Sequence, residues 1–183
     1  MKRSAVVLIA TLLVGGLGCA PTPGQTIKPV GPGTVTFTTK DPSQDAEMAK
    51  ELWRKLEAAQ YRDNWATVPG KGTFYRGQIP HGLLLSTYLN PEAERGMTSK
   101  RGRTPDNSII VKENYAPDKT LLALTVMYKE AGYDPEHNDW FWAKYGPDGE
   151  IQVAGKGKGC ITCHGSVRSN DFIFTFPVAP IKP

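Results

Sequence analysis

Two cysteines and a histidine near the end of the chain have the spacing of a covalent cofactor attachment site. Cys160 and Cys163 are separated by two residues and His164 follows directly, which gives the pattern Cys-x-x-Cys-His. Two thiols at this spacing can each add to one vinyl group of a porphyrin, and the adjacent imidazole can then bind the iron. The run therefore predicts one covalently bound haem c, with His164 as a ligand of the metal.

A zinc site and a redox-active dithiol are the alternative interpretations of this run. Structural zinc needs about four ligands, but the third cysteine, Cys19, lies in the leader, and the other histidines, His81 and His137, stand alone. A thioredoxin-like dithiol opens a helix within alternating strands and helices, and the sequence around the motif shows no such pattern. Haem attachment is therefore the interpretation that the sequence favours.

Residues 1–18 have the features of a secretory signal peptide. Two basic residues are followed by an apolar run over residues 5–17 and by small residues before Cys19, and a permanent span would need about 20 apolar residues. Cleavage before Cys19 keeps Pro21 away from the cleaved bond. We therefore expect an exported protein on the periplasmic side, held to the membrane only by a lipid on Cys19. The alternative is a soluble secreted protein.

The rest of the chain divides into a linker and one domain. Residues 19–40 are rich in proline and glycine, a composition that builds no core, so we expect a flexible tether before a single domain over residues 41–183. The leader has two basic residues and no acidic one, so its removal lowers the formal net charge from +4 to +2. This charge does not indicate nucleic acid binding.

The pattern of apolar residues predicts a mostly β domain of the α+β class, an antiparallel sheet with an N-terminal helix. Asp41 as N-cap, Pro42 in the first turn and apolar residues at helical spacing predict a helix from residue 41 to about 60. Short segments rich in β-branched and aromatic residues, separated by turn signals, predict strands over residues 83–89, 108–115, 120–128, 140–145, 150–153 and 172–176.

Two basic runs lie outside these elements. Residues 92–103 are expected to form a charged loop, and Lys156 and Lys158 flank the Cys-x-x-Cys-His run. Such runs are usually solvated surface. The second could instead attract an acidic electron-transfer partner, such as a soluble cytochrome, to the haem edge.

The late position of the motif restricts the fold. Only 19 residues follow His164, so the preceding chain must build most of the haem pocket. Small class I cytochromes c carry the motif near the beginning and wrap it with later helices. Four-helix cytochromes c′ carry it late, but residues 83–155 lack their helical patterns. A mostly β pocket is therefore expected.

Over residues 61–177 the chain resembles cytochrome P-460 and its relatives, the β-type cytochromes c′. The resemblance implies a mostly antiparallel sheet, a homodimer, and one haem whose five-coordinate iron is bound by His164 as proximal ligand. Several short runs in a fixed order carry it: Tyr61-Arg62-Asp63-Asn64-Trp65, Tyr88-Leu89-Asn90-Pro91, Ile109-Ile110-Val111-Lys112-Glu113, Lys129-Glu130, Asn138-Asp139-Trp140, the Cys-x-x-Cys-His run and Asp171-Phe172-Ile173-Phe174-Thr175.

The resemblance also gives Lys112 a role. In cytochrome P-460 a strand lysine bonds its side-chain nitrogen to a meso carbon of the porphyrin, and Lys112 matches that position. Alternation along the strand places Lys112 on the face of Ile110, opposite Ile109 and Val111. Desolvation beside a haem favours a neutral, nucleophilic amine. The alternative is a solvated strand lysine beside Glu113.

Thr125 stands where hydroxylamine-oxidising relatives carry a distal carboxylate. A carboxylate can accept a proton as a general base, whereas a threonine hydroxyl can only donate a hydrogen bond to a bound ligand or order a water. Thr125 is therefore a candidate distal-pocket residue that favours binding over turnover. The alternative is a strand residue present for its β-branch.

Three further residues are weighed as ligands of the iron. Met127 shares the face of Thr125 and could be a sixth ligand, although a methionine inside a strand is more often core. His81 could face the distal cavity, or it could be structural or exposed. His137 lies among polar residues and is expected at the surface.

Two functional hypotheses follow from these residues. In the first, which Lys112 favours, the protein handles hydroxylamine or nitric oxide at a five-coordinate haem and passes electrons to a soluble cytochrome. In the second, which Thr125 favours, it is a non-enzymatic nitric oxide binder or an electron carrier. The distal pocket decides between them.

Overall fold

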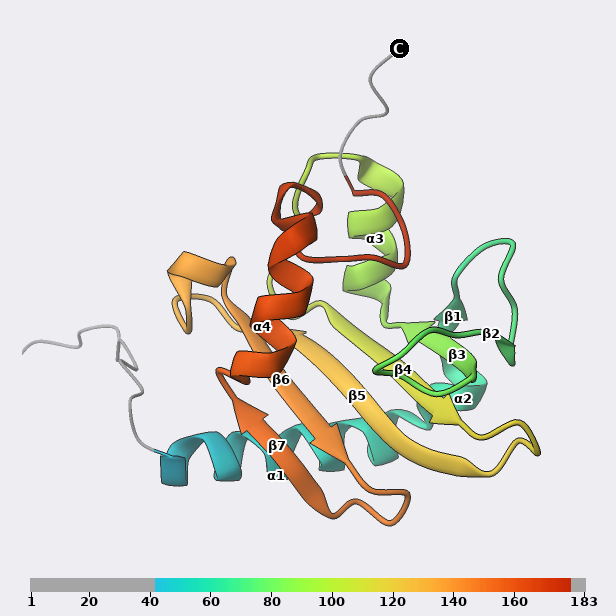
Figure 1. Ribbon diagram of the computed structural model, residues 1–183. Helices are drawn as coiled ribbons and strands as arrows, with labels where there is room; N and C mark the ends of the chain where they lie inside the picture. Colours follow the sequence, from blue (N-terminus) through green and yellow to red (C-terminus); the bar gives the residue numbers. More distant parts are fainter. Residues whose placement is uncertain (1–41, 179–183) are drawn as a thin grey trace, which may run out of the picture. The chain divides into compact units, whose positions relative to one another are not determined.

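The structure is a computed structural model that describes residues 42–178, which form an antiparallel sheet with helices on both faces (Figure 1). The expected signal peptide, the tether and Cys19 lie outside the described residues. The helices are α1 (Pro42–Ala59), α2 (Tyr61–Asn64), α3 (Pro91–Ser99) and α4 (Lys158–His164). The strands are β1 (Ala66–Thr67), β2 (Tyr75–Arg76), β3 (Leu84–Leu89), β4 (Ile109–Tyr115), β5 (Leu121–Lys129), β6 (Trp140–Tyr145) and β7 (Ile151–Gly155).

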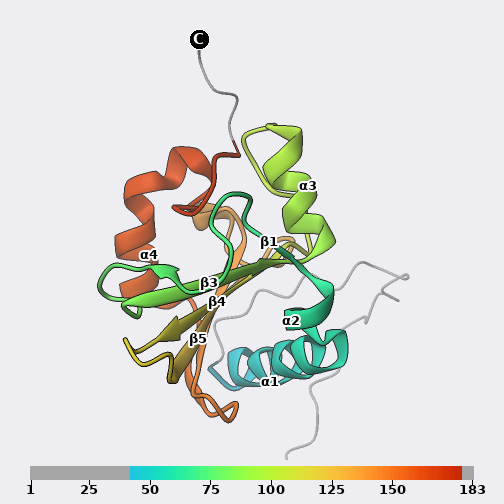
Figure 2. The same cartoon turned by 90° about the vertical axis from the view of Figure 1, so that its right-hand side faces the viewer.

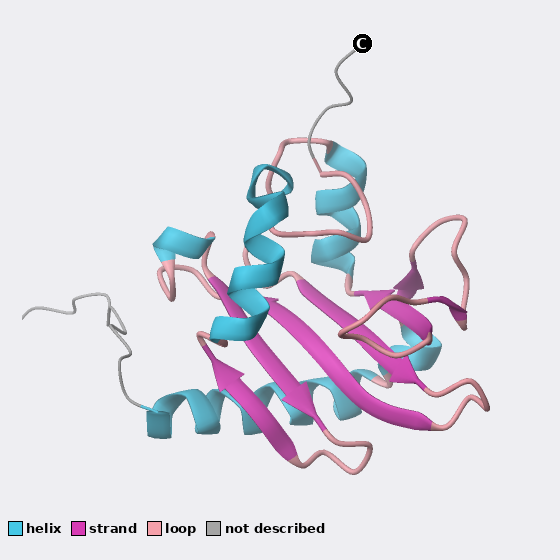
Figure 3. Ribbon diagram, viewed as in Figure 1, coloured by secondary structure: helices cyan, strands magenta, loops and turns pink. Residues whose placement is uncertain are grey.

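The sheet confirms the expected fold class. Its strands follow the order β1-β3-β4-β5-β6-β7, with β2 also paired to β3, and every pairing is antiparallel. The strands β4 to β7 are consecutive in the chain; short turns join β4 to β5 and β6 to β7, and a longer connection with a 3-10 helix at Pro135–His137 joins β5 to β6 (Figure 3). Five expected strands are present within one or two residues of their expected ends. The two-residue strands β1 and β2 were not expected.

Helix α1 confirms the expected N-terminal helix and covers one face of the sheet. Ala49, Leu52 and Leu56 recur at helical spacing and are buried against sheet residues such as Val111 and Val126. The Tyr145 hydroxyl also donates a hydrogen bond of 2.8 Å to the Ala49 carbonyl oxygen. This face is therefore the main hydrophobic core.

The opposite face of the sheet is covered by α3, α4 and the chain after α4, as the turned view shows (Figure 2). Side chains from β4, β5 and β6, including Ile110, Met127 and Trp142, pack there against Met97 and Phe176. The sheet thus separates two apolar clusters, and the Cys-x-x-Cys-His helix lies over the second.

The expectation of a charged loop over residues 92–103 is wrong for its first part, because α3 occupies Pro91–Ser99. The Asn90 side chain accepts a hydrogen bond from the Ala93 amide, and Pro91 stands at the first helical position. Both features stabilise a helix start. Ala93 and Met97 are buried on one side of the helix, so its charges occupy only the solvent side.

The expected strand over residues 172–176 is absent, and irregular backbone takes its place. Asp171 and Phe172 have positive φ angles of 55° and 62°, which end any extended run. The Asn170 amide donates to the carbonyl oxygens of Ile173 and Phe176. A side chain therefore satisfies the backbone groups that a neighbouring strand would otherwise satisfy.

Within residues 42–178, no helix has the length and apolar character needed to cross a membrane.

Candidate functional site

The Cys-x-x-Cys-His run forms most of α4, which begins three residues after the end of β7. α4 follows the consecutive antiparallel strands β4 to β7, and no strand follows it within residues 42–178, so the expectation that no alternating strand and helix pattern surrounds the motif is confirmed. Burial raises the pKa of the Cys160 thiol, whereas a reactive dithiol needs a thiol with a lowered pKa. Cys163 is exposed. The electrostatics of the motif thus do not favour dithiol chemistry.

His164 ends α4 and turns its ring into the molecule. Its Nδ1 atom lies 2.7 Å from the Phe172 carbonyl oxygen, and the Trp142 and Phe174 ring centroids lie 4.8 Å and 5.2 Å from that of the imidazole. Burial lowers the pKa of His164, which favours the neutral form of the ring. A neutral imidazole with Nδ1 held by a carbonyl leaves Nε2 for a metal.

The antiparallel register brings the expected pocket residues together. Lys112 pairs with Thr125, which pairs with Lys144 on the next strand, and the neighbouring row holds Ile110, Met127 and Trp142. All these side chains lie on the face that α4 covers because alternate residues share a face. The expected position of Lys112 on the face of Ile110 is confirmed.

Two adjoining cavities lie between this face and α4. One, of about 460 Å³, is lined by Cys160, Cys163 and Trp142, and the other, smaller cavity is lined by Lys112 and Met127. His81, Thr125 and His164 line both cavities. The structure therefore gathers the cysteines, His164, Lys112, Thr125, Met127 and His81 around two cavities that share three lining residues.

The charge state of Lys112 follows from this position. Burial, and to a smaller degree the nearby Lys71, lower the pKa of Lys112 to about 8. A larger share of the amine is therefore neutral near pH 7 than in a solvated lysine. The alternative of a solvated strand lysine is not supported.

Thr125 and His81 share a hydrogen-bonded cluster at the junction of the cavities. The Thr125 Oγ1 lies 3.3 Å from His81 Nδ1, which itself lies 3.0 Å from Asn114 Oδ1. Burial, followed by the charge of Lys112, lowers the pKa of His81 to about 4, so its ring is neutral at physiological pH. His81 therefore faces the cavity, one of the alternatives that its sequence left open.

The remaining candidate ligands lie elsewhere or are less well placed. Met127 is buried on the wall of the smaller cavity. His137 is half-buried, with Nδ1 2.8 Å from a carboxylate oxygen of Asp134, and lines neither cavity. Lys156 lies 3.2 Å from another Asp134 oxygen, whereas Lys158 stands exposed at the edge of the cysteine-lined cavity.

The residues present fit a haem. The indole Nε1 of Trp142 is the one buried side-chain nitrogen or oxygen of residues 42–178 without a hydrogen-bond partner. Since buried polar groups are normally paired, this donor indicates that a bound group supplies an acceptor, and haem carries two carboxylates. The larger cavity also has the volume of small-molecule and cofactor sites. Two thiols and a neutral imidazole in its wall supply the donors that haem attachment needs.

Zinc is not supported in the described part of the chain. There, the one group of three or more side chains that could hold a metal ion is Asp134, Glu136 and His137, which includes neither cysteine of α4. A cysteine pair without further ligands does not make a structural zinc site.

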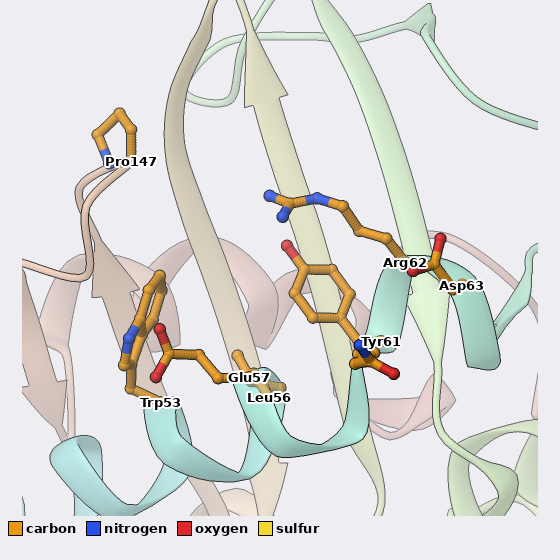
Figure 4. A pocket seen from close by; sticks show the side chains of 8 residues that line it. Trp53, Leu56, Glu57, Tyr61, Arg62, Asp63 and Pro147 are labelled. Carbon is orange, nitrogen blue, oxygen red and sulfur yellow. The ribbon is translucent and has the colours of Figure 1, made fainter.

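A further hollow, of about 370 Å³, lies on the opposite face of the sheet, beside α1 and α2. Figure 4 shows Trp53, Tyr61 and Arg62 extending from these helices. Tyr61 and Arg62 both donate to the buried Glu113 carboxylate. This hollow has no thiol or imidazole in its wall, so it is not the haem site.

Together, the antiparallel sheet, the inward-turned His164 and the cysteine-lined cavity define a class, the mostly β haem proteins. A comparison with family models gives the particular family: the model described as Cytochrome P460 matches residues 58–175, more than half of the chain. The chain therefore belongs to the cytochrome P460 family, which confirms the resemblance, and it is a haem protein related to the handling of hydroxylamine and nitric oxide. No curated protein matches it in a sequence comparison.

Proposed function

We propose that the protein is an exported c-type monohaem protein that handles hydroxylamine or nitric oxide at its haem and passes electrons to a soluble cytochrome. The observation that carries this proposal is the pair of adjoining cavities between α4 and the sheet, both lined by His164 and Thr125, one also by Cys160 and Cys163 and the other by Lys112. The haem supplies an iron that binds small nitrogen species and changes oxidation state.

The residues of α4 would hold the haem. Cys160 and Cys163 would form the two thioether bonds, and His164 would bind the iron through Nε2. The hydrogen bond from Nδ1 to the Phe172 carbonyl fixes the tautomer and the ring orientation. This arrangement supports one covalently bound haem c.

Lys112 would form a third covalent bond, between its Nζ and a porphyrin carbon. Joining them replaces an N–H and a C–H bond by a C–N bond, so two protons and two electrons leave, and an oxidant such as a peroxide must take them up. Burial favours the neutral amine that the reaction needs. Peptide mass spectrometry tests the bond, because a Lys112 peptide without porphyrin mass contradicts it.

A second candidate function is non-enzymatic binding of nitric oxide, or simple electron transfer. No aspartate or glutamate among residues 42–178 lines either cavity, so the described wall supplies no carboxylate base. Thr125 can hold a ligand by a hydrogen bond, but it cannot remove protons from hydroxylamine at neutral pH. This favours binding over turnover.

The proposed location follows from the sequence, and the proposed electron-transfer partner follows from a lysine at the edge of the cysteine-lined cavity. A lipid on Cys19 would hold the domain at the periplasmic side of a membrane, and loss of membrane association in Cys19→Ser tests this. Lys158, exposed beside the cysteine-lined cavity, would attract an acidic soluble cytochrome. A homodimer, as in the family, would give twice the monomer mass in solution.

The deciding experiment uses protein matured in a host that attaches haem c. After denaturation and extraction with acidified acetone, the haem should stay with the polypeptide, and loss of the pigment would end the proposal. Steady-state oxidation of hydroxylamine with an artificial electron acceptor then separates the candidates. Turnover supports the enzyme, whereas spectral binding of nitric oxide without turnover supports the binder.

A further inference from the structure

A second imidazole faces the hollow that His164 faces. The ring centroids of His81 and His164 are 6.3 Å apart and their planes are inclined by 88°. Nδ1 of His164 lies against the Phe172 carbonyl, and Nδ1 of His81 lies 3.0 Å from the Asn114 amide oxygen. Metal-binding histidines are usually held in this way, with one ring nitrogen bonded to the protein and the other left for the metal.

The separation of the two rings matches direct binding of one metal ion from opposite sides. Each metal–nitrogen bond is about 2 Å long, and the bonded nitrogen lies about 1 Å from the centre of its ring, so the two centres are about 6 Å apart. A histidine that only hydrogen-bonds to a ligand on the metal must lie farther away, by the length of that ligand. The observed 6.3 Å leaves no room for one.

The lining of the two cavities also supports a metal position between these rings. His81, Thr125 and His164 are the residues common to both cavities, of which one contains Cys160 and the other Lys112. A flat porphyrin with its metal between the imidazoles would lie mainly in the larger cavity, and one edge would reach the smaller cavity, which has a volume of about 30 Å³. The attachment thiols and Lys112 would then meet different edges of the ring, as three covalent bonds require.

The backbone of the loop before β3 holds His81 in place. The Gly77 amide donates to the Leu83 carbonyl oxygen at 2.8 Å, and the His81 amide donates to Gln78 at 3.0 Å. Gly82 lies so close to Tyr115 of β4 that a Cβ there would be 2.5 Å from the Tyr115 carbonyl oxygen. The loop therefore packs tightly against the sheet and carries the imidazole with it.

We infer that His81 is the second axial ligand of the haem iron, bound through Nε2 opposite His164 in the ferric protein. The inference rests on the haem of the proposed function and replaces the expected five-coordinate iron by a six-coordinate resting state. Hydroxylamine or nitric oxide must then displace His81 before binding. His164 directly follows an attachment cysteine, so it would stay on the iron, and His81 would be the ligand that leaves.

Absorption and electron paramagnetic resonance spectra of the ferric holoprotein test this inference. The wild type should show a low-spin iron with two imidazole ligands, and His81→Ala should show a high-spin iron. Added imidazole should restore the low-spin spectrum of His81→Ala. If His81 is bound to the iron in nine-tenths of the wild-type molecules, imidazole should bind the iron of His81→Ala roughly tenfold more tightly than that of the wild type. His137→Ala is the matched control, and its spectrum should equal that of the wild type.

Two results would overturn the inference. A high-spin wild-type iron shows that His81 does not bind it, and this outcome needs no variant. A His81→Ala protein that stays low-spin without imidazole assigns the sixth position to another group, such as Met127 or Lys112. Should His81→Ala carry no haem, His81→Gln takes its place with the same expectation. Retention of haem after denaturation, with either result, leaves the proposed function standing, whereas absence of haem removes the proposed function itself.

Discussion

The buried ion pair between Lys129 and Asp171 gives the most quantitative prediction, the effect of Asp171→Ala. Both side chains are fully buried, and Lys129 Nζ lies 2.7 Å and 2.8 Å from the two carboxylate oxygens. Asp171 also accepts hydrogen bonds from the Thr104 amide and hydroxyl and from Asn138. The carboxylate thus joins β5 to the segment whose next residue, Phe172, orients His164.

The expected loss in the free energy of unfolding is about 3–5 kcal/mol, because removing the carboxylate leaves a buried ammonium with only the Asn138 carbonyl oxygen and the Trp140 ring beside it. Burial lowers the pKa of Lys129 to about 8, and Asp171 opposes this shift. In Asp171→Ala the pKa of Lys129 falls further, so the folded variant releases the Lys129 proton at a lower pH than the folded wild type. Since the unfolded lysine still holds its proton there, the stability of the variant should rise between pH 6 and pH 8, where that of the wild type changes less.

Denaturant unfolding of the holoprotein at pH 6 and pH 8 measures both effects. Asp106→Ala removes an exposed carboxylate and should stay within about 0.5 kcal/mol of the wild type. Adding Lys129→Met to Asp171→Ala removes the uncompensated charge, so the double variant should be more stable than Asp171→Ala alone. A loss below about 1 kcal/mol for Asp171→Ala, with no recovery toward pH 8, would refute the argument.

Two further predictions concern the pocket. Thr125→Glu supplies the missing base and should increase steady-state hydroxylamine oxidation by about 10²- to 10⁴-fold; an equal rate in Thr125→Gln, which has the same shape without the base, would show that proton acceptance is not limiting. Gly82→Ala places a methyl group against the Tyr115 backbone, so it should lower stability by about 1–3 kcal/mol and shift the ferric spectrum toward high spin by moving His81. Gly165→Ala, whose methyl group meets open space, should change neither; unchanged stability in Gly82→Ala would contradict the packing.

Period-two alternation explains why much of the site was predictable from the sequence. Successive residues of a strand alternate between the faces of the sheet, so the sequence placed Lys112 on the face of Ile110, and the family resemblance then indicated that this face lies toward the haem. Thr125 and Met127 share that face for the same reason. The motif on α4 was predictable because its chemistry depends on spacing within five consecutive residues.

The rest of the site depends on contacts between residues far apart in the chain. Asn90 caps α3 and also accepts a hydrogen bond from the Ile109 amide, 19 residues later, so the charged sequence of α3 alone indicated a loop. The segment after α4 is held by Asn170 and Asp171 instead of a strand partner. Local sequence propensity predicts neither arrangement, because tertiary contacts satisfy the backbone hydrogen-bonding groups there.

His81 illustrates the same limit at the functional centre. Between proline and glycine in a loop, a histidine has no periodic pattern that assigns it a face, and its sequence neighbourhood is equally typical of an exposed turn. Only the packing of Gly82 against β4 and the hydrogen bond to Asn114 turn the ring toward His164. Sequence spacing therefore identifies the two cysteines and His164, which one helix carries. The proposed distal side comes from a loop and two strands that meet only in the folded protein, so the inferred role of His81 depends on the structure.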